Sequence, residues 1–490
     1  MKQIILSAFA LLMFTTGCQQ EKGGEQSIDS NELMETIRFL ADPDLQGRLS
    51  GSEGYNKAAL YVAQSFKDLG LEDLGCNNFF QEFDLEYNEI LHSSFYLKSP
   101  GQDSTHYQLG KDYICRGFSG SGDIEAHVVF CGYGISKPGS GYDDYEDVDV
   151  KGKIVVQFKS DPRWKVDGEY IGFHSLRKKA SIAKEKGALG IIYVSKPNVR
   201  MPQKPIGSVM HGEGEHLIHF PQIHMSLATA QDFFQYSEYS LSQLQQRIDS
   251  TNKPHSVEIP VKAGMEVRAN YEKEQPSMNV VGLLPGKHPE LSEKYIVLGA
   301  HLDHVGEQAG TVYFPGANDN ASGVASLMKV AEAMAKGERP DRSIIFVAFT
   351  AEESGLVGSQ YFVNHSPVAL DKIELMINMD CVAHGDSIVI GGGKSFPEIY
   401  QKAREEDKRM KGMVIDRTWR GGGADATAFY EQGIPTLYFA TSNSYTHLHL
   451  PSDKPETINA SLHQYLTWLV YKITGRFASG KEKLSDERDN

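Results

Sequence analysis

Apolar residues near the start of the chain recur at the spacing of a helix. Leu33, Ile37 and Leu40 share one helical face behind Asp29, a residue type that caps helix N-termini. A second apolar stripe covers residues 55–69 and stops at a glycine. The sequence therefore predicts two amphipathic helices here, joined by the polar, glycine-rich loop DLQGRLSGSEG.

The pattern changes between residues 95 and 265. Short β-like runs alternate with turns, as in HVVFCGYGI, KGKIVVQF and ALGIIYVSK, and a helix is expected at KKASIAKEKG. We therefore expect residues 95–265 to form a separate, β-rich module inserted into the domain that residues 29–94 begin.

Residues 266–476 return to alternating strands and helices. The apolar runs SMNVVGLLPG and EKYIVLGA have the length of buried strands, and amphipathic segments follow them. This alternation predicts the α/β class, with a mixed, largely parallel central sheet covered by helices on both faces. The charged segment 477–490 is expected to fray.

The N-terminus has the pattern of an export signal. Lys2 precedes an apolar run over residues 4–14, which is too short to span a membrane, and Gly17 and Cys18 follow. We predict a signal peptide over residues 1–17, lipidation of Cys18, and a polar tether over residues 18–28. Thr15 departs from the leucine usual at its place, and plain secretion is the alternative. Either outcome predicts an exported protein at the periplasm or cell surface.

Composition excludes some classes of partner. The 490 residues carry a formal net charge of −15, which argues against nucleic acid or an anionic membrane surface as the main partner. After Cys18 the cysteines are Cys76, Cys115, Cys131 and Cys381, none at zinc-knuckle spacing. We predict no specific disulfide, and expect Cys131 and Cys381 to be buried as small hydrophobic residues.

Five residues of metal-ligating type stand at the ends of apolar runs or at the mouths of loops: His301, Asp319, Glu353, Asp380 and His449. Strand ends in such a sheet share one edge, where ligands bind. Imidazole and carboxylate groups suit zinc, and five ligands exceed what one catalytic zinc uses. The sequence therefore predicts two Zn²⁺ ions, with Asp319 as the candidate bridge.

Neighbouring residues offer alternatives for several of these positions. His304 rivals His301 as a ligand, and Asp303 is expected to orient the His301 imidazole or else to cap a loop. Asp319 and Asn320 precede an amphipathic helix, so an Asx cap is the structural alternative.

The acidic pair after the run Ser343–Phe349 predicts a division of labour. Glu352 and Glu353 are adjacent and cannot point the same way, so Glu353 is expected to bind metal. Glu352 then serves as general base toward water and as acid toward the leaving amine. Two solvated glutamates at a helix start are the alternative.

In YTHLHLPSDKPE, His447 and His449 compete for the last ligand position, and the spacing to Pro451 and Asp453 favours His449. Asp425, in RGGGADATAFY, is expected to cap a helix that begins near Ala426.

Five motifs in this order, GAHLDH, GANDNASG, AEESGLVGS, INMD and HLPSD, resemble those of the M28 family of zinc aminopeptidases. The resemblance covers nearly the whole mature chain, and the inserted module resembles a protease-associated (PA) domain. It implies a three-layer zinc-peptidase fold and a pair of zinc ions. Asp319 would be shared between two groups, one with His301 and Asp380 and one with Glu353 and His449.

One residue departs from the family pattern. Many members have a tyrosine directly before the last histidine ligand, where it helps to hold the oxyanion, but here the residue is Leu448. Tyr445 and His447, in the same loop, are the candidates to replace it.

The leading interpretation is a zinc exopeptidase, namely an aminopeptidase acting on peptides with a free N-terminus through water activated by two zinc ions, with Glu352 as base. A glutaminyl cyclase-like acyltransferase with one zinc is an alternative, which the five-ligand set disfavours. A carboxypeptidase or dipeptidase of the same family is another. A non-catalytic binding protein is disfavoured because Glu352 is retained.

Overall fold

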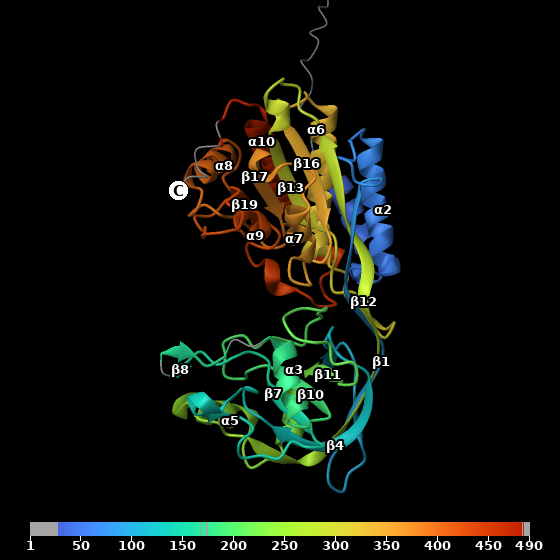
Figure 1. The fold of residues 1–490 in the computed structure, drawn as a ribbon, viewed down its shortest axis with the longest axis vertical. Helices are drawn as coiled ribbons and strands as arrows, with labels where there is room; N and C mark the ends of the chain where they lie inside the picture. The colour runs from blue at the N-terminus through green and yellow to red at the C-terminus, as the bar shows by residue number, and fades with distance from the viewer. Residues whose placement is uncertain (1–27, 167, 173–174, 483, 485–490) are drawn as a thin grey trace, which may run out of the picture.

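The chain forms two lobes joined by two long antiparallel strands, β1 (Phe80–Lys98) and β12 (Val257–Leu284), as Figure 1 shows. This computed structural model describes residues 28–166, 168–172, 175–482 and 484. The predicted signal peptide and Cys18 lie outside the described residues. Within them, every helix is too short or too polar to cross a membrane.

The upper lobe has a mixed, largely parallel sheet at its centre, as predicted. The strand order is β18-β19-β17-β13-β16-β12, and the four middle strands run parallel. These four are β13 (Tyr295–His301), β16 (Ser343–Phe349), β17 (Ile373–Met379) and β19 (Thr436–Thr441). The outer strands β18 (Ile388–Gly391) and β12 are antiparallel to their neighbours.

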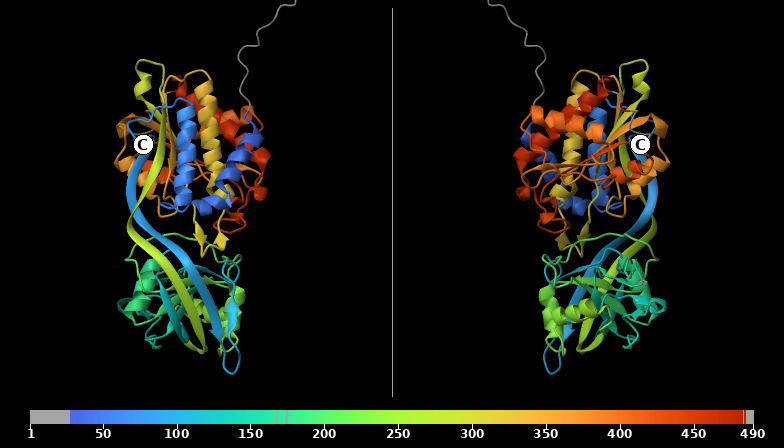
Figure 2. Two further views of the ribbon diagram at one scale, coloured as in Figure 1. Left: turned by 90° about the vertical axis from the view of Figure 1, so that its right-hand side faces the viewer. Right: turned by 90° about the vertical axis from the view of Figure 1, so that its left-hand side faces the viewer.

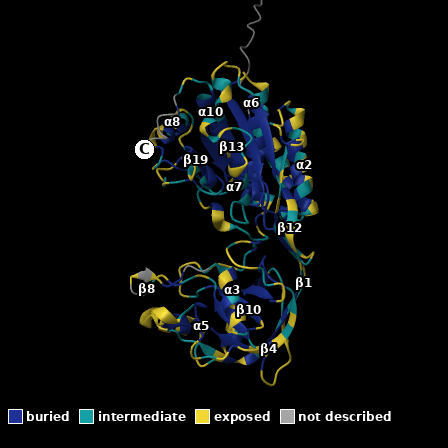
Figure 3. Cartoon of the chain, in the orientation of Figure 1, coloured by how far each residue is buried: buried dark blue, intermediate teal, exposed yellow. Residues whose placement is uncertain are grey.

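Helices cover both faces of this sheet and give three layers (Figures 1 and 2). Ile296 and Leu298 of β13 pack into the core on one face, and Val297 between them packs into the core on the other, as strand alternation requires. The first core includes residues of α1 (Ser30–Leu40), α2 (Glu53–Asp68), α6 (Ser322–Lys336), α8 (Pro397–Arg409) and α10 (Ala460–Ala478). The second includes residues of α7 (Val357–Asn364) and α9 (Ala426–Tyr430). Figure 3 shows the sheet as the buried centre.

Both predicted N-terminal helices are confirmed. The Asp29 side chain accepts a hydrogen bond from the Asn31 backbone N–H and caps α1. The second helix begins at Glu53, two residues before the expected start, because the Ser52 side chain accepts from the Tyr55 N–H.

The lower lobe is the inserted module, and it has its own hydrophobic core. Its parallel strands are β4 (Gly122–Phe130), β7 (Ile154–Phe158), β10 (Gly190–Val194) and β11 (Gln222–Met225), with β3 (Tyr113–Cys115) antiparallel at the edge. It also contains α3 (Leu176–Glu185), α4 (Leu227–Phe234) and α5 (Leu241–Thr251), of which only α3 was expected from the sequence. The expected boundaries 95 and 265 fall inside β1 and β12, because these strands run through both lobes.

The remaining strands are short: β2 (Thr105–Tyr107), β5 (Ser136–Lys137), β6 (Tyr142–Asp143), β8 (Lys165–Val166), β9 (Glu169–Tyr170), β14 (Glu307–Gln308) and β15 (Val312–Tyr313).

The C-terminal segment is more ordered than its charge suggests. Helix α10 continues to Ala478 with Phe477 fully buried, and Leu484 is also buried. Arg342 donates to the backbone carbonyl oxygens of Phe477 and Glu482 and fixes the segment against the sheet. The expectation of a frayed tail from residue 477 is therefore wrong as far as residue 482, and residues 485–490 lie outside the described part.

The four described cysteines are free and buried. Cys131 and Cys381 are buried as predicted, Cys131 directly after β4 and Cys381 two residues after the end of β17.

Candidate metal centre

The predicted metal ligands gather where neighbouring parallel strands end. His301 is the last residue of β13, Glu353 lies in the turn after β16, and Asp380 directly follows β17. Asp319 precedes α6, and His449 lies in the loop after β19. Because the carboxyl ends of parallel strands share one edge of the sheet, residues from distant parts of the chain meet there.

Two groups of potential ligands share Asp319. In the first, His301 Nε2 lies 3.3 Å from Asp319 Oδ1 and 3.3 Å from Asp380 Oδ1. In the second, His449 Nε2 lies 3.3 Å from Asp319 Oδ2 and 2.9 Å from Glu353 Oε2. The two oxygens of the Asp319 carboxylate thus face different groups, which is the geometry of a bridging ligand.

The spacing within each group fits zinc. Zinc bonds of about 2.0–2.1 Å in a tetrahedron place neighbouring ligand atoms roughly 3.3–3.4 Å apart. The imidazole-to-carboxylate distances on both sides of Asp319 are 3.3 Å. The side chains are therefore already close to the separation that coordination requires.

His304, the rival of His301, lies in the second group. Its Nδ1 is 3.0 Å from Glu353 Oε1 and 3.6 Å from Asp319 Oδ2. Its buried Nε2 has no hydrogen-bond partner in the described part of the chain. His304 thus adds a donor beside Glu353, while His301 is the histidine that lies between Asp319 and Asp380.

Carboxyl groups dominate the electrostatics of the site. Burial alone would lower the pKa of His301, but the charge of Glu352 and hydrogen bonds to Asp319 and Asp380 raise it well above its usual value. The pKa of His449 is raised in the same way, against burial, by Glu353 and Asp319. The site therefore stabilises positive charge strongly, and a pair of divalent cations would supply that charge.

Glu352 is the carboxyl group suited to carry a proton. Burial raises its pKa well above the usual value, and the charges of Glu353 and Asp380 raise it further, whereas His301 lowers it. Because a general base works best when its pKa lies near the working pH, this shift favours a proton-carrying role.

The Asp303 carboxylate contacts the turn after β16 and not, as expected from the sequence, the His301 imidazole. Its carboxylate lies 3.8 Å from His301 Nδ1, too far for a hydrogen bond, and that nitrogen is 3.1 Å from the Asp303 backbone oxygen instead. The carboxylate accepts hydrogen bonds from the backbone N–H groups of Glu352 and Glu353, at 3.1 and 3.3 Å. Asp303 therefore fixes the turn that presents the acidic pair.

The two helix caps considered from the sequence have different outcomes. Asn320, not Asp319, caps the start of α6, since its Oδ1 accepts from the Gly323 N–H at 2.9 Å. The Asp319 carboxylate is left to face the two groups. Asp425 precedes α9 but makes no capping bond, because its backbone is already helical and the side chain cannot fold back onto the first turn. It is fully buried, and burial raises its pKa to about 7.

Tyrosines surround Asp380. The Tyr438 hydroxyl donates to Asp380 Oδ2 at 2.9 Å and is thereby occupied. Tyr445, in the same loop as His449, is 62% exposed, and partial burial together with the charge of Asp380 raises its pKa to about 12. The Nδ1 of His447 forms a hydrogen bond of 2.9 Å with the Ser452 hydroxyl. Because Ser452 engages His447, Tyr445 is the remaining candidate for the missing oxyanion tyrosine.

Sequence reasoning missed Arg48, in the stretch expected to be a loop. Its fully buried guanidinium donates to the backbone carbonyl oxygens of Leu302, Pro315 and Gly316 at 2.8–3.0 Å. These bonds hold the chain beside His301 to the segment that leads into Asp319. The only signal was an arginine between short polar residues and glycines, which does not distinguish a buried arginine from an exposed one.

Asp453 is a second supporting residue, noted in the sequence only for its spacing from His449. Its carboxylate accepts from the backbone N–H groups of Asn318 and Asp319 at 3.0 Å. This contact ties the His449 loop to the segment that carries Asp319.

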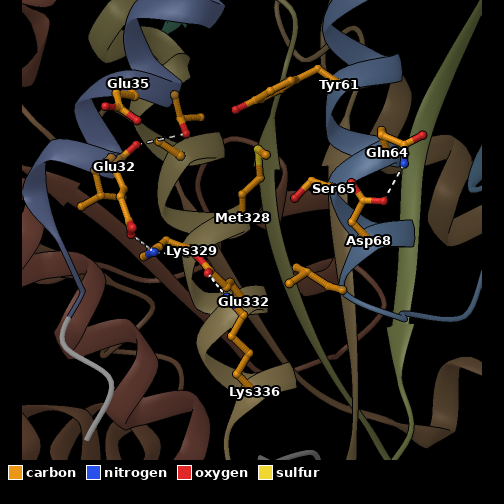
Figure 4. Close-up of a pocket in the computed structure, with 14 residues that line it drawn as sticks. Glu32, Glu35, Tyr61, Gln64, Ser65, Asp68, Met328, Lys329, Glu332 and Lys336 are labelled. Atoms are coloured by element: carbon orange, nitrogen blue, oxygen red, sulfur yellow. Dashed lines mark hydrogen bonds and ion pairs between the residues drawn. The ribbon is translucent and has the colours of Figure 1, made fainter.

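A separate groove lies on the surface between α1, α2 and α6, with a volume of about 530 Å³ (Figure 4). Lys329 pairs with Glu32 of α1 across the groove and with Glu332 on its own helix, and Lys336 also pairs with Glu332. Both lysines of the groove are therefore engaged in ion pairs.

Known proteins resemble this chain most clearly over the segment that contains the predicted ligands. Residues 279–474 match the model of peptidase family M28, and this segment contains all five predicted ligands. A glutamate carboxypeptidase 2 homolog of Caenorhabditis briggsae is 24% identical, with 90% of this chain and 68% of that protein covered. Aminopeptidase YwaD of Bacillus subtilis is 24% identical, covering 84% of this chain and 77% of that protein.

Solved structures share the fold of both lobes. A zinc aminopeptidase from Bacillus subtilis superposes with a TM-score of 0.63 at 21% identity, covering 94% of this chain and 98% of that one. The family model does not extend over the inserted module, whose resemblance to a PA domain stays a prediction. The motifs and the match over residues 279–474 identify the segment that carries the site as similar to peptidase family M28.

Proposed function

We propose that the chain is an aminopeptidase that uses two zinc ions. The observation that carries the proposal is the position of Asp319, whose two carboxylate oxygens face two separate groups of ligands. His301 and Asp380 would complete one metal site, and Glu353 and His449 the other. His304 lies beside Glu353 and is a further potential donor to the second site.

Bound zinc would supply Lewis-acid chemistry, polarising the scissile carbonyl and lowering the pKa of water. The protein's own contribution is proton transfer. Glu352 would accept a proton from the attacking water and deliver it to the departing amine, for which its raised pKa is suited. Asp303 would keep Glu352 and Glu353 in fixed orientations through their backbone N–H groups.

Tyr445 is the proposed donor to the developing oxyanion. Burial and the charge of Asp380 raise its pKa, and the other nearby tyrosine, Tyr438, already donates to that carboxylate. A hydroxyl aimed at the place where negative charge develops stabilises the transition state more than the substrate.

The acid-rich surroundings favour a substrate with a free α-amino group, whose positive charge they would attract. We therefore expect N-acetylation of a good peptide substrate to abolish cleavage nearly completely, and C-terminal amidation to have little effect. Equal cleavage of acetylated and free peptides would reject the aminopeptidase assignment. Sensitivity to amidation instead would point to carboxypeptidase action, as in the name of the Caenorhabditis relative.

The glutaminyl cyclase alternative is less well supported. It needs one zinc, whereas the chain presents two ligand groups that share a carboxylate.

We also propose that the protein is exported and anchored by lipid at Cys18, on the evidence of the N-terminal pattern alone. Mass spectrometry of the mature N-terminus tests this. A chain that begins beyond Cys18 without lipid, or one that retains Met1, would contradict it.

A further inference from the structure

The inserted module contains a cavity of about 1160 Å³ that the chemistry of the metal centre does not use. It lies where the neighbouring parallel strands β7 and β10 end: Lys159 directly follows β7, and Ser195 and Lys196 directly follow β10. Ser175 and Leu176, at the N-terminus of α3, form part of its wall. Ligands of open α/β sheets bind at such strand ends, and the helix N-terminus adds partial positive charge.

Cationic side chains around this cavity outnumber acidic ones, in a chain whose net charge is −15. Lysines and arginines contribute four: Lys159, Arg163, Lys196 and Arg200. Neither Arg163 nor Arg200 has an ion-pair partner in the part of the chain that the structure describes. Burial lowers the pKa of Lys159 to about 6, with the nearby Arg116 charge adding to the effect. An anionic ligand would relieve this cost.

The acidic residues of the cavity are already engaged. Asp161 pairs with the fully buried Lys179 at 2.7 Å, behind the cavity wall. Asp249 accepts hydrogen bonds from the Tyr133 hydroxyl at 2.6 Å and from Gln245 at 3.0 Å. The four cationic side chains of the lining thus outnumber its two carboxylates.

The cavity also has an apolar and aromatic part. Trp164 packs edge-on against Tyr133, with ring centroids 5.3 Å apart, and its indole N–H is buried without a partner among the described residues. Met201 is 84% exposed and Val199 is 40% exposed on the same wall. Apolar surface beside fixed cationic groups suits an organic anion better than a bare inorganic one.

A short stretch of chain links the cavity wall to the metal centre. Gln203 lines the cavity, and four residues later the Gly207 N–H donates to the His449 carbonyl oxygen at 2.8 Å. Four residues span at most about 14 Å, so the two places are close. A bound peptide and the metal centre would thus share one segment of chain.

We propose that this cavity is a second peptide-binding site, which holds a short peptide through a carboxylate, either a C-terminal carboxylate or an acidic side chain. Arg163 and Arg200 bind the carboxylate, and Trp164 and Met201 contact the adjoining peptide. The site acts by binding alone and does not depend on which peptide bond the metal centre cleaves.

Binding to the zinc-loaded, full mature chain carrying Glu352→Gln tests this proposal, because no peptide is turned over there. The probe is the N-acetylated tetrapeptide Ala-Ala-Ala-Glu, compared with its neutral analogue, in which Gln replaces Glu and the C-terminus is amidated. Isothermal titration calorimetry should give at least roughly tenfold weaker binding for the neutral peptide, and added salt should weaken the charged one. Trp164 should report binding by a change in fluorescence.

Two further peptides, each with one of the two carboxylates, identify which one is held. Adding Arg163→Gln and Arg200→Gln to the Glu352→Gln chain should weaken binding of the charged peptide roughly tenfold, because both arginines are exposed and their loss spares the fold. Lys253→Gln, an exposed cation of the same module outside the cavity, should leave it unchanged. Equal binding of charged and neutral peptides, or an unaltered affinity in the double arginine variant, would overturn the proposal. Either result would leave the aminopeptidase assignment untouched.

Discussion

The backbone N–H of Gly207 in the inserted module donates to the carbonyl oxygen of His449, the last predicted zinc ligand, across 2.8 Å. His449 has a φ of 53°, a left-handed conformation that a histidine adopts at a cost. The lower lobe therefore supports the backbone of a predicted metal ligand in the upper lobe. Through this hydrogen bond the inserted module helps to hold the loop that carries His449.

Gly207→Val should weaken this support. A Cβ at residue 207 would lie 2.6 Å from Val305 and 3.0 Å from Phe314, so the segment must move away from the His449 loop. We expect faster loss of zinc to a chelator and lower activity, with both lobes still folded. Gly139→Val is the matched control, since a Cβ there meets nothing within 4 Å. Equal zinc retention in the two variants would show that the contact is dispensable.

Glu352→Gln should reduce kcat by roughly a hundredfold to ten-thousandfold and leave zinc bound, because it removes the proton carrier but no ligand. Glu353→Gln should instead lower the zinc content, since Glu353 faces His449 at 2.9 Å. Steady-state kinetics and metal analysis of both proteins distinguish the roles. Near-normal turnover by pure Glu352→Gln protein would refute the proposed mechanism.

Tyr445→Phe removes the proposed oxyanion donor and should lower kcat by roughly a hundredfold, with KM and zinc content little changed. Tyr430→Phe, which alters a tyrosine of α9 packed against the core, provides the control. If Tyr445→Phe keeps full kcat, another group must stabilise the oxyanion.

Asp144 in the inserted module should make stability depend on pH. Burial raises its pKa to about 7, so from about pH 4, its ordinary pKa, to about pH 7 the folded chain keeps a proton that the unfolded chain has lost. Stability contributed by this proton is present at low pH and is lost as pH rises through the window. The thermal midpoint of this lobe should therefore fall from pH 5 to pH 8.

Asp144→Asn should flatten that dependence. The amide can still accept from the Tyr133 and Ile135 N–H groups and can donate to the Tyr142 hydroxyl, so the contacts survive without the charge. Calorimetry at the two pH values gives the comparison, with the exposed Asp147→Asn as control. An unchanged slope in Asp144→Asn would show that other groups set the dependence.

Much of the fold follows from local pattern. The run that ends at His301 is apolar because β13 is buried on both faces, and the same holds for the strands before Glu352 and Asp380. The sequence also contained an unused signal for α5: Ser240 and Gln243 form a capping box ahead of Leu241, Leu244 and Ile248.

Other features depend on contacts between distant residues. Arg48 binds the Leu302 carbonyl 254 positions away, which no local pattern indicates. Asp319 and Asn320 are equally good cap residues by type, and only the backbone path decides that Asn320 turns to the helix. The partner of the Asp303 carboxylate likewise depends on where the turn after β16 comes to lie.

The central claim is that the chain holds two zinc ions joined by Asp319. Elemental analysis of protein saturated with zinc and freed of excess metal measures this directly. The account predicts two zinc ions per chain, since Asp319 presents an oxygen to each ligand group. A clean content of one zinc per chain would contradict it and would favour the single-zinc cyclase alternative.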